Sequence, residues 1–153
     1  MATLNSVNYA KTQNNQKIDP AEMNGRMKGM HDSYTLPGVV LAANDEVNSS
    51  FIPEGAIITN AWIKSPSLGT TGILQMGLRA HVDEDGAAVA EDPDGLVASA
   101  DAGGQAVFQN NGTEDLIGSK IGKGGAQVFL KCTEVSTLTA VKFEWHVEYL
   151  LPS

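Results

Sequence analysis

The sequence has few of the residues that a disulfide-stabilised or membrane-spanning protein needs. Cys132 is the one cysteine among 153 residues, so no disulfide can form within the chain. No apolar run approaches the ~20 residues that cross a bilayer, and the first residues lack the continuous apolar segment of a secretory signal. We therefore expect a protein made in the cytoplasm, without a membrane partner, whose fold rests on apolar packing and backbone hydrogen bonds.

Basic residues are also few, because ten Lys and Arg stand against eighteen Asp and Glu, giving a net charge of −8. Residues 1–35 contain four basic and three acidic residues, whereas the remaining 118 residues contain six basic and fifteen acidic ones. Binding to nucleic-acid phosphates requires a surface of Lys and Arg. The acidic part of the chain therefore disfavours nucleic acid as a partner.

Residue patterns of common enzyme sites are absent from the sequence. The histidines His31, His81 and His146 form no metal-binding pair, and there is neither a GxSxG elbow nor a GxxxxGK[ST] phosphate loop. Cys132 lies in an apolar run, where a small buried thiol is the ordinary interpretation and a nucleophile would need a neighbouring base. We expect a protein that is not an enzyme and needs no cofactor.

Short apolar runs next to turn-forming residues are what the sequence does contain. Branched and aromatic residues fill residues 56–63, 73–78 and 126–133, and each run directly follows a glycine. From Val141 to Tyr149, apolar residues alternate strictly with charged or polar ones, which is typical of a strand with one face in a core. These patterns predict strands at all four places.

The whole pattern predicts a mainly β fold, an antiparallel β-sandwich of jelly-roll type, with about seven or eight strands. A first strand is expected at residues 38–42 and a short helix after Asp94. Residues 1–35 are rich in Asn, Gln and Met and show no hydrophobic period. We therefore expect two parts, an extended N-terminal arm at residues 1–35 and the sandwich at residues 36–153.

The strand at residues 56–63 has apolar residues on both of its faces. A strict period of two places Ile58 and Trp62 on one face and Ile57, Ala61 and Ile63 on the other. We expect one set in the core and the other at a contact with a second subunit. The predicted core residues are Ile58, Trp62, Phe143, Trp145 and Val147, and the predicted interface residues are Ile57, Ala61 and Ile63.

Carboxylates gather between residues 83 and 94 without an intervening Lys or Arg. Such oxygens suit Ca²⁺, which takes about six to eight oxygen ligands, although the spacing is not that of an EF-hand. Two interpretations stay open, a solvated acidic surface and a cation site. The candidate ligands are Asp83, Asp85, Asp92 and Asp94.

Several segments together resemble a family of virion proteins. They are Asn8-Tyr9-Ala10-Lys11-Thr12, Gly25-Arg26, Tyr34, the stretch from Ile52 to Trp62, Leu74-Gln75-Met76-Gly77 and the closing Glu148-Tyr149. In these the chain is similar to capsid decoration (cement) or minor capsid proteins of tailed phages. The resemblance implies a non-enzymatic jelly-roll subunit, a homotrimer, attached to the outer capsid surface.

The resemblance also implies a partner, the major capsid protein, and a role for the N-terminal arm in binding it. The arm residues expected to contact the capsid are Tyr9, Lys11, Lys17, Arg26 and Lys28. A different function class stays open beside this one, a receptor-binding or carbohydrate-binding β-module of a tail fibre or other host-contact structure. Such a module would expose aromatic rings on which sugars stack.

Overall fold

The apolar runs predicted to be strands are strands in the computed structural model, which describes residues 3–5, 27–65, 73–101, 106–109, 114–137 and 139–151. No helix occurs among these residues, so none there could cross a membrane. The strands are β1 (Thr3–Asn5), β2 (Met27–Thr35), β3 (Glu46–Ile52), β4 (Ile57–Ser65), β5 (Ile73–Leu78), β6 (His81–Val82), β7 (Ala88–Val89), β8 (Asp92–Asp101), β9 (Ala106–Gln109), β10 (Ala126–Cys132) and β11 (Lys142–Leu150).

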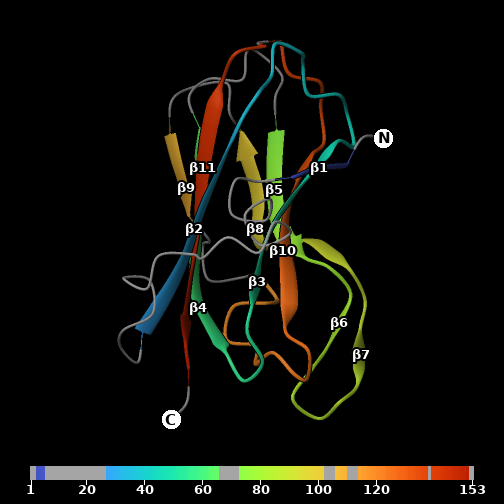
Figure 1. Cartoon of the computed structure of the whole chain (residues 1–153), viewed down its shortest axis with the longest axis vertical. Helices are drawn as coiled ribbons and strands as arrows, with labels where there is room; N and C mark the ends of the chain where they lie inside the picture. Colours follow the sequence, from blue (N-terminus) through green and yellow to red (C-terminus); the bar gives the residue numbers. More distant parts are fainter. Residues whose placement is uncertain are drawn as a thin grey trace.

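The longer strands form two sheets that enclose a common core (Figure 1). Sheet A has the order β1-β3-β10-β5-β8, and sheet B has the order β2-β11-β4-β9. Leaving out β1, β6 and β7 and counting the other strands along the chain, the sheets read 2-7-4-5 and 1-8-3-6, which is the strand order of a jelly roll. All pairings among these eight strands are antiparallel. The predicted fold class is therefore confirmed.

Two additions extend the jelly roll. At the edge of sheet A, β1 pairs in parallel with β3, and Leu4 packs against the core. The β6–β7 hairpin projects from the side of the sandwich (Figure 1) and is tied back where the Gly122 N–H donates to the Val82 carbonyl oxygen at 2.9 Å. A Cβ atom on Gly122 would lie 1.8 Å from the carbonyl oxygen of Asp83. Only glycine lets the two segments approach this closely.

The structure corrects the predicted boundary between an arm at residues 1–35 and a sandwich at residues 36–153, because β2 is a full strand of sheet B. All nine residues of β2 pair with β11. Met30 and Asp32 are buried, and Asp32 Oδ2 accepts a hydrogen bond of 2.9 Å from Ser49 Oγ in the core. A carboxylate at an inward position hides the period of two, so the sequence pattern missed this strand.

Two smaller predictions are also wrong. Residues 38–42 form a loop instead of a strand, and Gly38 has a φ of +88° that breaks the extended conformation. The residues after Asp94 belong to β8 instead of a helix, because β8 pairs with β5. A Cβ atom on Gly77 in β5 would lie 1.8 Å from the carbonyl oxygen of Asp92. Close pairing with β5 therefore overrides the local capping signal.

The core lies between the inward faces of the two sheets. On β11, Phe143, Trp145 and Val147 are fully buried, which is the alternation that the sequence predicts. Each large apolar side chain buried in this way contributes about 1.5–3 kcal/mol to the free energy of unfolding. Cys132 is buried in the same core, with its Sγ 2.7 Å from the carbonyl oxygen of Glu134.

Candidate interaction surfaces

The residues predicted to bind a capsid through the arm fall mostly outside the part of the chain that the structure describes. Tyr9, Lys11, Lys17 and Arg26 all lie outside the described residues. Lys28 is described, but it belongs to β2, where it is half-buried and lies opposite Tyr149 of β11. Lys28 is therefore a residue of the sandwich and not of an extended arm.

A β-bulge in β4 corrects the predicted faces of this strand. Along β11, Glu148 and Tyr149 are neighbours, yet they lie opposite Asn60 and Ile58, so Thr59 is an extra residue in β4. The bulge reverses which residues face inward beyond this point. A strict period of two cannot anticipate such a reversal.

The predicted interface residues consequently separate. Ala61 and Ile63 are fully buried with Ile58 in the chain's own core, so they cannot contact a second subunit. Ile57 is half-buried, and its pairing with Leu150 places it on the outer side of sheet B. Trp62, which was predicted in the core, is half-buried and lies on the same outer side as Ile57.

Three ring-bearing residues form a row in register across β2, β11 and β4 on the outer side of sheet B, and their rings cluster together. His146 of β11 lies opposite His31 of β2 and opposite Trp62 of β4. The Trp62 and His146 rings stack with their centroids 5.4 Å apart and their planes at 16°, and the His31 centroid is 6.2 Å from each of the others. We call this outward-facing surface of β2, β11 and β4 the ring face.

Gly29 makes room for the row. A Cβ atom at Gly29 would lie 2.4 Å from Cε1 of His146, so the imidazole occupies the space above β2 that a side chain would fill. Burial of the ring lowers the pKa of His146, with the nearby His31 acting in the same direction and Glu148 against it. His146 is thus on the outward face, as the alternation predicts, but it is half-buried by its neighbours.

Charged residues of both signs flank the rings. Lys142 Nζ pairs with Glu144 Oε1 at 2.9 Å, and this hydrogen bond lowers the pKa of Glu144. Toward the other end of the face, Glu148 accepts a hydrogen bond of 3.3 Å from Asn60 Nδ2 and lies 3.8 Å from His146 Nε2. The ring face therefore combines an aromatic centre with a mixed-charge border.

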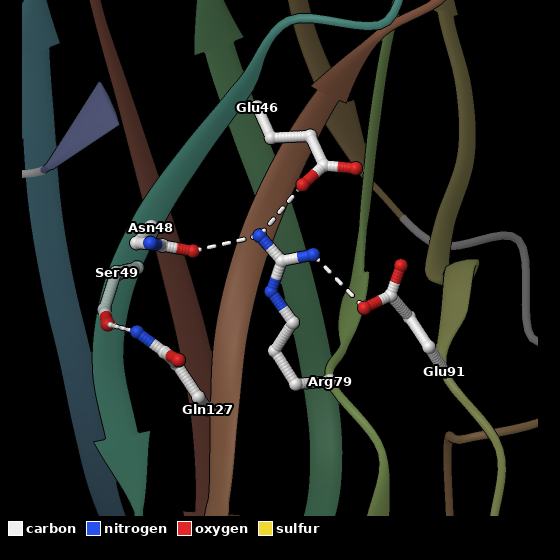
Figure 2. A network of polar contacts seen from close by, with 6 residues as sticks. All are labelled: Glu46, Asn48, Ser49, Arg79, Glu91 and Gln127. Atoms are coloured by element: carbon white, nitrogen blue, oxygen red, sulfur yellow. Dashed lines mark hydrogen bonds and ion pairs between the residues drawn. The ribbon is translucent and has the colours of Figure 1, made fainter. Parts of the chain in front are cut away.

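The outer side of sheet A is organised around Arg79 (Figure 2). The guanidinium group pairs with Glu46 at 2.8 Å and Glu91 at 2.9 Å, donates to Asn48 Oδ1 at 2.7 Å, and lies 3.9 Å from the centroid of the Phe129 ring. Glu46 and Phe129 are buried beneath it. The carboxylates and the aromatic ring all belong to this chain, so the cluster ties β3 and β10 to the segments that adjoin β5 and β8.

The acidic residues proposed as cation ligands do not form one site. Asp83 Oδ1 accepts hydrogen bonds from the backbone N–H groups of Asp85 and Ala87, which closes the turn of the β6–β7 hairpin. Asp83 and Asp85 line a hollow that also contains Lys120 and Lys123, whose positive charges oppose a cation.

Asp92 and Asp94 line a different hollow. Burial, and then the neighbouring Asp94, raise the pKa of Asp92. Among the described residues, no group of three or more His, Cys, Asp or Glu side chains lies close enough to hold a metal ion.

Comparison with known proteins relates the fold of this chain to solved structures. The sequence matches no protein-family model, and no curated protein matches it. The structure is similar to a chain of the capsid of Ralstonia phage GP4, with a TM-score of 0.68 and 17% sequence identity over 99% of each chain. The chain has the fold of a phage capsid protein.

A second solved structure agrees with the first. The chain is similar to a chain of the cyanophage Pam1 capsid asymmetric unit, with a TM-score of 0.55 and 21% identity over 85% of this chain and 88% of that one. The resemblance to phage capsid proteins, stated from the sequence, is thereby confirmed at the level of the fold.

Sequence reasoning missed the ring face because its three rings come from three separate predictions. The alternation of β11 predicted His146 on the outer face. A strict period of two, which ignores the bulge in β4, predicted Trp62 in the core, and His31 fell within the predicted arm. The one signal of the ring face in the sequence was His146, a histidine on the outward face of the most regular predicted strand. Its neighbours on the adjacent strands become known only with the register.

Proposed function

We propose that this chain is a structural protein of a phage virion that binds the outer surface of the capsid lattice and stabilises it, as a decoration or cement protein without catalytic activity. The observation that carries the proposal is the similarity of the whole jelly roll to a chain of the Ralstonia phage GP4 capsid, over 99% of both chains. Its partners are the major capsid protein and further copies of itself, assembled as a homotrimer.

Stabilisation of the shell follows from linkage. A protein that binds only the assembled lattice shifts the equilibrium toward the lattice by an amount that grows with its concentration above Kd, about 2.7 kcal/mol per site at 100 Kd. Once one subunit of the oligomer has bound the shell, its other subunits are held close to neighbouring shell subunits. Their binding is then intramolecular, which raises the overall avidity. The protein therefore acts through adhesion, and the fold contributes rigid surfaces.

Contact with the shell is proposed to involve the residues before β2, among them Tyr9, Lys11, Lys17 and Arg26. The side chains of Lys11, Lys17 and Arg26 are basic, whereas the remainder of the chain is acidic. A shell surface with exposed carboxylates would attract them without attracting the acidic sandwich. Because β1 ends at Asn5 and β2 begins at Met27, a deletion that tests this contact has to lie between these two residues.

The test mixes the purified protein with capsid shells that lack it and measures co-sedimentation, stoichiometry to the shell protein and the melting temperature of the shell. We expect saturable binding and a raised melting temperature. The variant Lys11→Gln with Lys17→Gln should bind more weakly, and the matched control Lys120→Gln with Lys123→Gln should bind like the wild type. Absence of binding to any shell preparation would exclude the proposal.

One observation favours the second function class, a carbohydrate-binding or receptor-binding module. Trp62 is half-exposed on a strand face beside Asn60 and Glu148, whose polar groups could bind sugar hydroxyls. A glycan-array signal that Trp62→Ala abolishes, together with failure to bind shells, would favour this function over the first.

A further inference from the structure

We propose that the ring face is the surface through which two copies of this chain contact each other. The inference deepens the proposed function and rests on it for the expectation that copies of the chain meet in an assembly. It assigns the self-contact to the outer side of sheet B, where β2, β11 and β4 carry the row His31, His146 and Trp62.

The shape of the ring face suits contact with another surface. Since Gly29 has no side chain, the His146 ring lies over β2, and Trp62 stacks parallel to it at 16°. The aromatic centre is therefore spread over the sheet instead of projecting as one side chain. A tryptophan at the centre of a surface is typical of the anchors that dominate interface energetics.

An apolar row continues the ring face toward the end of sheet B. Met27 and Ile57 both lie opposite Leu150. Met27 is 60% exposed and Leu150 is 36% exposed. Large apolar side chains next to an aromatic cluster extend the area that would leave water on contact.

Charge identifies a second copy as the occupant. The chain has a net charge of −8, so repulsion between two copies is least when they meet through a surface that is close to neutral. On the ring face, Lys64 and Lys142 balance Glu144 and Glu148, which gives no net charge while the histidines are neutral.

Other partners fit this surface less well. A strongly basic or strongly acidic partner would be matched by a face of one sign, and the ring face has both signs. Where the same face of each copy meets its neighbour in an oligomer, the lysines of one copy can lie against the glutamates of the next, so a face with both signs suits a second copy of itself. The acidic hairpin β6–β7 lies away from this face, beside sheet A (Figure 1).

The first experiment measures the oligomeric state of the full chain by sedimentation over a range of concentrations. We expect the wild type to associate and Trp62→Glu to sediment as a single chain. The matched control is Phe51→Glu, which places the same charge on the outer side of sheet A at a residue that is 52% exposed. A Trp62→Glu variant that associates like the control, or a wild type that is monomeric at every concentration, would overturn the inference.

A second experiment needs no variant and so does not depend on the folding of Trp62→Glu. The chain has two tryptophans, and Trp145 is fully buried, so quenching of tryptophan fluorescence by acrylamide reports on Trp62. We expect quenching to increase severalfold on dilution, as the copies separate. Quenching that does not change with concentration would overturn the inference.

The outcome is separable from that of the proposed function. Shell binding is measured by co-sedimentation with capsids, whereas self-contact is measured in their absence. A wild type that associates through Trp62 but binds no shell would exclude the capsid function and leave the self-contact standing. A wild type that binds shells but shows no concentration-dependent change at Trp62 would do the reverse.

Discussion

Trp145 Nε1 donates a hydrogen bond of 2.9 Å to Ser49 Oγ at the centre of the sandwich. Ser49 Oγ in turn donates to Asp32 Oδ2 at 2.9 Å, and all three residues are buried. The chain of bonds joins β11 and β2 of sheet B to β3 of sheet A. It satisfies an indole N–H and a carboxylate that apolar packing alone would leave unpaired.

We predict that Ser49→Ala lowers the free energy of unfolding by about 1–3 kcal/mol, since both Trp145 Nε1 and Asp32 lose this partner. The neighbouring Ser50→Ala is the matched control, because the Ser50 hydroxyl is buried without a hydrogen-bond partner. Its removal should be neutral or stabilising. Denaturant unfolding measures both, and equal destabilisation by the two variants would contradict the assignment.

Arg79 provides a second prediction. Replacement by Met keeps an apolar stem over Phe129 but leaves buried Glu46 without its ion pair, so we expect a loss of about 1–3 kcal/mol. The comparison is Lys142→Met, which breaks an exposed pair with Glu144 and should change stability by less than about 1 kcal/mol. Chemical denaturation of both variants in low and moderate salt makes the measurement. A smaller effect at Arg79 than at Lys142 would show that the cluster does not hold sheet A together.

His146 makes stability depend on pH with a definite sign. Burial lowers the pKa of His146 in the folded protein, so between that value and the ordinary value of about 6.5 the unfolded chain binds more protons than the folded one. Stability therefore falls as the pH falls through this window, and above it the group has no effect. His146→Gln should flatten the dependence of the free energy of unfolding on pH below about 6.5. An unchanged slope would contradict this source of acid sensitivity.

Cys132 should be unreactive in the folded protein. Burial raises the pKa of its thiol to about 11, so the thiolate that reacts with disulfide reagents is scarce at neutral pH. We predict that a chromogenic disulfide reagent at pH 8 labels no thiol in the native protein and labels one per chain after unfolding in denaturant. Rapid labelling of the native protein would mean that this region of β10 opens readily.

The sequence by itself determined the strands whose side chains follow a simple rule. β11 alternates apolar and polar residues without exception, and the runs that became β4, β5 and β10 are branched, short and preceded by glycine. With no helical period competing, these local preferences are sufficient to indicate a mainly β jelly roll. The expectation that Cys132 is a buried thiol rests on the same local apolar context.

Tertiary structure decided what depends on register and on contacts between distant residues. Asp32 faces the core, where Ser49 of β3 donates a hydrogen bond to it, and a partner on a distant strand cannot be read from the residues of β2. The extra residue Thr59 turns Trp62 outward and Ala61 inward, which no period of two predicts. The ring face exists because three strands far apart in sequence align His31, His146 and Trp62 in one row, and such alignment is set by the pairing of the whole sheet.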